Sequence, residues 1–131
     1  MSHMAKVATK LRQKSALVKA LKEMRPGWQA EVHAQPVAMR TYYARDMHSA
    51  EIIVRNVGMV STDVGFAQQS DGTYALVADN MNRELFGPTF LNRLTQLYAK
   101  HIVIEQQARS GYRVLSEKVR TDGTIEMVVE Q

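Results

Sequence analysis

The sequence contains no cysteine. This absence excludes a disulfide framework, a thiolate zinc site, an iron–sulfur cluster and a cysteine nucleophile, and it is compatible with a reducing compartment. The apolar runs are only a handful of residues long, whereas about 20 are needed to span a bilayer. The N-terminus also lacks a hydrophobic signal core. We therefore expect a cytoplasmic protein that does not associate with a membrane.

Motifs that carry known chemistry are also missing. The glycines are spread singly, and none forms a Gly-rich phosphate loop followed by Lys and Ser or Thr. The histidines His3, His33, His48 and His101 have no short ligand spacing, and no carboxylate completes a metal-binding pattern on a shared helical face. The sequence therefore predicts no metal, no cofactor and no catalytic residue, and an enzyme is the least favoured class.

The overall composition is that of an ordinary globular domain. The chain has 131 residues, of which 45% are hydrophobic and 23% are charged. This length suits one compact core, so we expect a single domain over residues 1–131.

Two stretches have the periodicity of helices. The first covers Gln13–Met24, where apolar residues recur at helical spacing before Pro26-Gly27 ends the pattern. The second covers Thr89–Ser110, where Pro88 marks the start and Gly111 the end. The sequence therefore predicts a short and a long helix.

The remaining ordered segments have strand patterns. The expected strands are Met4–Lys10 (a short strand or extended arm), Trp28–Val37, Glu51–Arg55, Asp63–Gln68, Thr73–Asp79 and the two arms of a hairpin within 111–129. Two Asp-Gly pairs, at Gly72 and Gly123, supply the positive φ that tight hairpins need. Strands joined by tight turns favour antiparallel pairing. We therefore predict an α+β fold, with a mainly antiparallel sheet and two helices packed on one face.

Several segments together resemble a known family. They are Met1-Ser2-His3, Lys10-Leu11-Arg12, Ala16–Leu21, Tyr74–Asp79, Phe90–Ala99, Asp122–Ile125 and Val128-Val129. This set is similar to the hypothetical chloroplast reading frame thirty-five family of cyanobacteria, plastids, other bacteria and some phages. The ungapped register from Met1 favours a native start over a purification-tag remnant. The chain departs from the family pattern at Asn80, where an aromatic residue is expected.

The resemblance implies a domain of unknown function and supplies no activity. It carries an expectation of partnership with an ATPase of the AAA class. It also implies a location in the plastid stroma if the source is a plastid, or in the host cytoplasm if the source is a phage.

Our leading functional hypothesis is a small non-enzymatic protein-binding or adaptor domain. Its candidate anchors are Trp28, Tyr42, Tyr43 and Met47, because aromatic residues and methionine are enriched at interfaces. Some of the methionines in or beside loops could be exposed and add an adaptable contact surface; the candidates are Met39, Met47, Met59 and Met81.

The alternative is a nucleic-acid-binding module. The net charge of +4 is modest, but basic residues crowd the first 25 positions. The candidates for a basic face are Lys6, Lys10, Arg12, Lys14, Lys19, Lys22 and Arg25. Arg40 and Arg45, from the loop that contains Tyr42 and Tyr43, could extend this face. Such a face would bind phosphates, whereas the competing interpretation is the solvated side of an amphipathic helix.

A polar site is the least favoured hypothesis. Asp79 ends an apolar strand and could project toward the Tyr74 hydroxyl, and His101 should lie along the buried stripe of the long helix. The ordinary role of a carboxylate at a strand end is to hold a turn, and that of a half-buried histidine is structural.

Overall fold

The computed structural model describes residues 3–43 and 45–130. A five-stranded sheet has the order β1 (Met4–Ala8), β5 (Tyr74–Asp79), β4 (Val64–Gln68), β3 (Ser49–Val54), β2 (Ala30–Ala38). Every neighbouring pair in it is antiparallel. A second sheet of two strands contains β6 (Arg113–Val119) and β7 (Ile125–Glu130). The helices are α1 (Lys14–Met24), α2 (Arg83–Phe86) and α3 (Pro88–Arg109), with a short 3-10 turn, η1, at Met59–Ser61. The predicted α+β class is confirmed.

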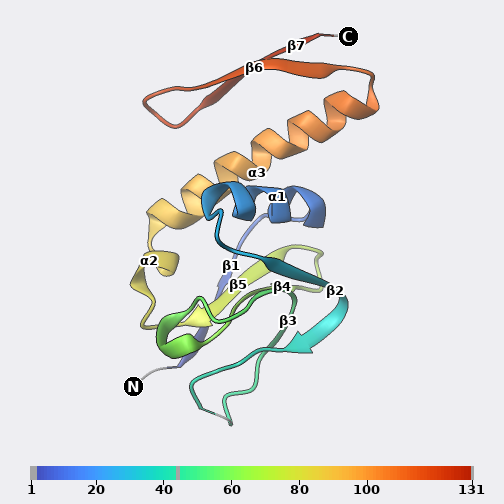
Figure 1. Cartoon of the computed structure of the whole chain (residues 1–131). Helices are drawn as coiled ribbons and strands as arrows, with labels where there is room; N and C mark the ends of the chain where they lie inside the picture. The colour runs from blue at the N-terminus through green and yellow to red at the C-terminus, as the bar shows by residue number, and fades with distance from the viewer. Residues whose placement is uncertain (1–2, 44, 131) are drawn as a thin grey trace.

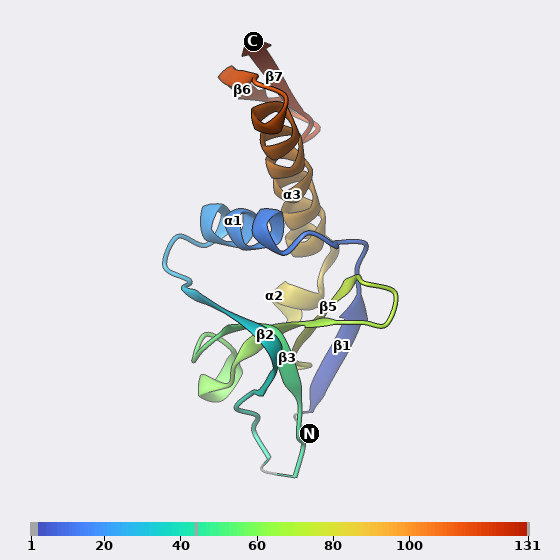
Figure 2. The same ribbon diagram turned by 90° about the vertical axis from the view of Figure 1, so that its right-hand side faces the viewer.

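Helices α1 and α3 cover one face of the five-stranded sheet (Figures 1 and 2). Alternate residues of each strand point to this face because side chains alternate along a strand. The helix-covered core is made of apolar side chains from both layers, including Leu17, Leu21, Ile52, Phe66, Tyr74, Leu76, Phe90, Leu94 and Leu97. The prediction that two helices pack on one face is therefore confirmed.

A tyrosine of α3 caps the first helix. The Tyr98 hydroxyl accepts hydrogen bonds from the backbone N–H groups of Arg12 (3.1 Å) and Gln13 (2.8 Å). The side chain of Gln13, the N-cap residue, makes no capping bond of its own. The long helix thus satisfies donors at the start of the short one, and this helps to fix their relative position.

The C-terminal hairpin forms as predicted but does not join the main sheet. It lies on the far side of α3 (Figures 1 and 2). Ile125, Met127 and Val129 on β7 are half-buried, whereas Val119 on β6 remains 51% exposed. Only the helix α3 is available to cover this small sheet, so the apolar face of the sheet is only partly buried.

The second face of the main sheet is covered by its own chain. Val32 pairs with Ile52 and Val37 pairs with Ala50, so β2 carries a large bulge between the two pairs. Pro36 lies within that bulge. Bulges bend strands, and the β2–β3 hairpin curls beneath the sheet, so that its loop approaches the start of β1 (Figures 1 and 2).

The two Asp-Gly turns are as predicted, since Gly72 and Gly123 have φ of 87° and 89°. The predicted strand at 28–37 begins two residues late, at Ala30. Helix α2 and the η1 turn were not predicted, because each is too short to show a periodic pattern. The opening Met1-Ser2 lies outside the described residues.

Candidate protein-binding surface

Three loops meet on the side of the main sheet that carries no long helix. They are residues 39–48 between β2 and β3, 55–63 between β3 and β4, and 80–82 between β5 and α2. The structure describes all of them except residue 44. We call this surface the loop end. Figures 1 and 2 show the first two loops below the sheet, away from α1 and α3.

Hydrogen bonds join the three loops to one another and to the start of β1. The backbone N–H of Asp63 donates to the Arg40 carbonyl (3.0 Å), which links the first two loops. The His3 N–H donates to the Asn80 side chain (3.1 Å), and the Asn80 N–H donates to the His3 carbonyl (2.7 Å). The loop end is therefore one connected surface.

An aspartate latches the longest loop across the sheet. The Asp46 carboxylate accepts a hydrogen bond from the Met4 backbone N–H (2.9 Å) and lies 3.0 Å from His48 Nε2. The bond from Met4, followed by that from His48, outweighs burial and holds the pKa of Asp46 below its usual value. Since β1 and β2 are opposite edges of the sheet, this latch ties the β2–β3 loop to the distant edge.

The side chain of Met39 anchors the same loop to the face of the sheet. A Cβ built at Gly65 would lie 2.6 Å from Met39 Sδ and 2.9 Å from Ala50 Cβ, so the absence of a side chain at Gly65 leaves the space that Met39 fills. Met39 is only 7% exposed. Met39 is therefore not one of the loop methionines that form an exposed surface. It packs with Ala50, Ile53 and Val77 in a second core, on the sheet face opposite the helices.

The other loop methionines are exposed, as predicted. Large hydrophobic side chains with substantial exposure on the loop end are Tyr42 (50%), Met47 (84%), Met59 (44%), Val60 (65%) and Met81 (48%). Single exposed apolar residues are ordinary on a protein surface, but a concentration of them indicates a contact site. The remaining exposed large hydrophobics in the described chain are Val32, Leu115, Val119 and Val128.

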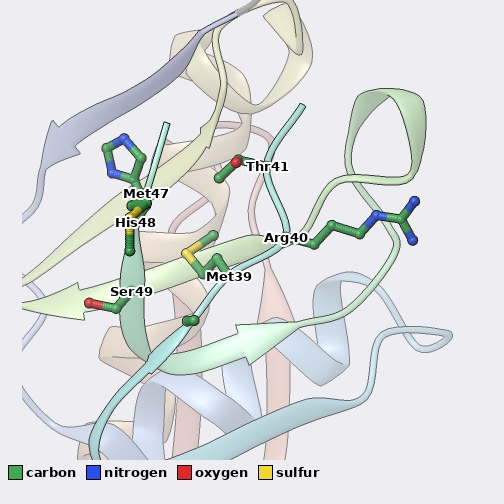
Figure 3. A pocket seen from close by; sticks show the side chains of 7 residues that line it. Met39, Arg40, Thr41, Met47, His48 and Ser49 are labelled. Atoms are coloured by element: carbon green, nitrogen blue, oxygen red, sulfur yellow. The ribbon is translucent and has the colours of Figure 1, made fainter. Parts of the chain in front are cut away.

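A pocket opens beside the most exposed of these residues. Its volume is about 480 Å³ and it is lined by Ala38, Met39, Arg40, Thr41, Met47, His48 and Ser49. Figure 3 shows the Met39 thioether between the two segments of the loop, whereas the Arg40 guanidinium points away from the pocket. The lining is mainly apolar, and methionine can adapt its shape to an incoming side chain.

Two tyrosines beside the pocket have different roles. Tyr43 is half-buried: Tyr42 packs edge-on against its ring at 4.7 Å, and the Arg45 guanidinium lies 5.5 Å from its centroid. Tyr42 is the more exposed of the pair. The structure thus brings the predicted anchors Tyr42, Tyr43 and Met47 together on one loop.

The fourth predicted anchor, Trp28, lies elsewhere. Its ring is half-buried and packs 6.1 Å from the Phe90 ring, between the end of α1 and the start of α3. The tryptophan therefore supports the helix-covered core, and it is not part of the loop end.

The seven predicted basic residues do not share one face. Lys6 lies opposite Val77 of the second core, on the sheet face that α1 does not cover. The others lie on or beside α1, and several have partners there. Lys19 pairs with Glu105 at 3.0 Å, Arg25 pairs with Glu84, and Arg12 donates to the Asp71 carbonyl. Lys14 donates to the His33 carbonyl at 3.5 Å, and Lys10 and Lys22 are exposed.

The three residues of the predicted polar site are not brought together. Tyr74 and Asp79 occupy opposite ends and opposite faces of β5. The Asp79 carboxylate accepts from the Met81 N–H at 2.8 Å, which is the turn-holding role expected at a strand end. Burial, followed by the nearby Glu51, raises the pKa of Tyr74.

His101 belongs to a different cluster, which the sequence did not reveal. Its Nε2 lies 2.8 Å from Glu23, as expected of a satisfied, half-buried imidazole. Beside it, the buried Lys100 ammonium donates to both Glu23 oxygens at 2.7 Å and to Glu117 at 3.3 Å. Burial acts to raise the pKa of Glu23, but the hydrogen bonds from Lys100 and His101 outweigh this effect. The pKa of Glu23 is therefore below its usual value. This cluster fastens α1, α3 and β6 together.

Lys100 follows Leu94 and Leu97 on the buried stripe of α3. Its position three residues after Leu97 was the only signal in the sequence. A lysine on an apolar stripe is normally taken as the edge of the solvated side, so the charged junction was missed.

Within residues 3–43 and 45–130, no group of three or more His, Asp or Glu side chains is placed to hold a metal ion. None of the helices described there combines the length and the apolar character needed to cross a bilayer.

Comparison with known proteins gives a family but no activity. A family model described as "Protein of unknown function (DUF1257)" matches residues 20–128. The chain is 29% identical over 133 residues to "Uncharacterized protein ycf35" of Cyanophora paradoxa, and 26% identical over 133 residues to the protein of the same name from Pyropia yezoensis. Each alignment covers 100% of this chain and 98% of the relative. No solved structure matches the chain.

Proposed function

Because the chain belongs to the DUF1257 family, whose description assigns no activity, we propose a function from the structure: it is a non-enzymatic protein-binding domain that engages its partner through the loop end. The observation that carries this proposal is the pocket of about 480 Å³ with Met47, 84% exposed, at its rim. An interface needs an apolar centre into which a partner side chain can be buried.

The construction of the loop end supports the same role. Its longest loop is held by the Asp46–Met4 bond and by the buried Met39, so the exposed side chains project from an anchored backbone. A surface that is already ordered loses less conformational entropy when it binds. Most of the free energy gained by burying Tyr42 and Met47 against a partner can therefore appear as binding affinity.

A strained backbone adds a second argument. Val60 is 65% exposed and has left-handed φ and ψ of 54° and 40°. A β-branched residue in this region costs about 1–2 kcal/mol. Strain of this kind is often concentrated at functional loops. The exposed side chains of Met59 and Val60 thus form a second part of the proposed contact surface.

The alternative, a nucleic-acid-binding module on the basic N-terminal residues, has less support. Lys6 lies on a different sheet face from α1, and two of the other cations are neutralised by Glu84 and Glu105. An ATPase of the AAA class is the partner that the family resemblance suggests, and we keep it as a candidate.

A comparative capture from native lysate tests the proposal. The bait is the full chain, and the test variant combines Tyr42→Ser with Met47→Ser. A matched control combines Leu115→Ser with Val128→Ser, which removes two exposed apolar side chains from the C-terminal hairpin. Nuclease treatment and two salt concentrations separate protein partners from nucleic acid.

We expect one stoichiometric protein to survive nuclease and higher salt. Its recovery should fall about tenfold or more with the loop variant, because losing an interface anchor costs roughly 1.4 kcal/mol or more. Recovery should not change with the hairpin variant. Loss of the partner only with the hairpin variant, or recovery of nucleic acid alone, would contradict the proposal.

A further inference from the structure

The carboxylates of the loop end are turned inward. Asp63 is 2% exposed and Asp79 is 1% exposed. Asp63 accepts from the backbone N–H groups of Arg40 (2.7 Å) and Asn56 (2.9 Å), and Asp79 accepts from that of Met81 (2.8 Å). Asp46 accepts from the Met4 N–H. Each of these carboxylates thus holds the backbone of a loop, and its negative charge is directed at backbone N–H groups rather than at the solvent.

Arg55 of the second loop pairs with Glu31 and Asp63, whereas three other arginines in or beside the loop end are exposed. Arg40 and Arg45 are exposed on the first loop, and Arg83 is exposed directly after the third. None of the three forms an ion pair with another described residue. The Arg45 guanidinium lies over the Tyr43 ring. Glu84, the neighbour of Arg83, is paired with Arg25.

The result is a surface that combines apolar side chains with uncompensated arginines. Arginine binds carboxylates through two parallel hydrogen bonds and is favoured at protein interfaces. Among the described residues of the loop end, Tyr42 is the only exposed large hydrophobic that is aromatic, whereas binding of single-stranded nucleic acid relies on several stacking rings. The mainly apolar pocket also suits an aliphatic or aromatic side chain better than a phosphate.

We propose that the loop end binds an acidic protein segment. One large apolar side chain of that segment enters the pocket beside Met47, and flanking Asp or Glu residues pair with Arg40, Arg45 and Arg83. This inference rests on the proposed function and specifies the chemistry of the partner.

Selection from a random twelve-residue peptide library tests the inference without knowledge of the natural partner. The library is selected on the full chain and, in parallel, on a variant carrying Arg40→Glu, Arg45→Glu and Arg83→Glu. A matched control carries Lys10→Glu, Lys22→Glu and Lys118→Glu. These are three exposed lysines outside the loop end, so the net charge changes equally. Circular dichroism and thermal unfolding verify that both variants are folded.

We expect the selected peptides to be enriched in Asp and Glu around a Leu, Ile, Met or Phe. Their affinity should fall at least tenfold with the arginine variant and about twofold or less with the lysine control, and it should weaken as salt rises. Selection of neutral or basic peptides, equal loss with both variants, or no enrichment would overturn the inference. So would preferential binding of a random single-stranded oligonucleotide library.

The two proposals fail separately. If the natural partner is lost with Tyr42→Ser and Met47→Ser but is retained by the arginine variant, the loop end is a protein-binding surface and only the acidic character of the partner is wrong. If neither change affects capture, the proposed function itself is wrong.

Discussion

The two faces of the main sheet are covered by different means. On one face, α1 and α3 supply large side chains that are almost completely buried, such as Leu17, Phe90 and Leu94. On the other, the curled β2–β3 hairpin covers a smaller core around Met39 and Ile53, and its loops leave Met47 and Val60 exposed. The first face holds most of the apolar burial that stabilises the fold. The second face is covered by a single hairpin, whose loops are held by side-chain hydrogen bonds and carry the exposed side chains of the loop end.

The largest effect should come from the helix-covered core. We expect Leu94→Ala to lower the free energy of unfolding by about 3 kcal/mol, since a fully buried leucine is replaced by a cavity. Urea unfolding measures this value. Leu115→Ala, at a side chain that is 52% exposed, should change it by less than about 0.5 kcal/mol. Equal losses would contradict the assignment of the main core.

The packing of Met39 against Gly65, on the second face of the sheet, can be tested by adding a methyl group. Gly65→Ala should cost about 2 kcal/mol, because the new methyl group would lie 2.6 Å from Met39 Sδ. The cost should shrink when Met39→Ala is already present, although Ala50 Cβ, 2.9 Å away, leaves part of it. Gly27→Ala, where nothing lies within 4 Å, is the control. Additive costs in the double variant would show that Met39 does not occupy this space.

The latch of the longest loop should depend on pH. The pKa of Asp46 is lowered in the folded chain, chiefly by the Met4 N–H. Its stabilising contribution is therefore present above the unfolded pKa, about 3.9, and is lost as pH falls through the lower folded value. Hydrogen exchange of the Met4 amide should accelerate over that window relative to other β1 amides.

Asp46→Ala should remove this pH dependence and reduce stability by on the order of 1 kcal/mol. Asp122→Ala, in the distant hairpin turn, should leave Met4 exchange unchanged. A Met4 amide that stays protected in Asp46→Ala would show that another group closes the loop.

The smallest effect should be a gain. Val60→Gly should raise stability by up to about 1 kcal/mol, because glycine adopts the left-handed backbone of residue 60 without a Cβ penalty. Thermal unfolding would show a slightly higher Tm. Val57→Gly should instead lower the Tm, because Val57 is not one of the residues with a positive φ. A lower Tm for Val60→Gly would contradict the strained geometry.

The parts of the fold that were predictable are those set by local patterns. The 3.6-residue period gave α1 and α3, and the Asp-Gly pairs gave the turns at Gly72 and Gly123. The curl of the β2–β3 hairpin was not predictable, because it depends on a bulge and on a bond between Asp46 and Met4, which are 42 positions apart.

The candidate site was predictable only in part. The clustering of Tyr42, Tyr43 and Met47 follows from their closeness in the sequence. The sequence could not show that Trp28 packs beside Phe90, or that Met39 fills a core. Arg40 and Arg45 were considered only as additions to a phosphate-binding basic face, and Arg83 was not singled out. Their prominence arises because Asp46, Asp63 and Asp79 turn inward onto backbone amides, and a count of charges along the chain cannot show this.

Site-specific photocrosslinking in cells would show whether the loop end contacts a partner protein. A photoreactive amino acid is placed at Met47 on the loop end or, in a second strain, at Leu115 on the hairpin, since both side chains are exposed. We expect one protein to crosslink to position 47 and not to position 115. Crosslinking of a partner at 115 alone, or no crosslink at 47, would contradict a protein-binding role for the loop end.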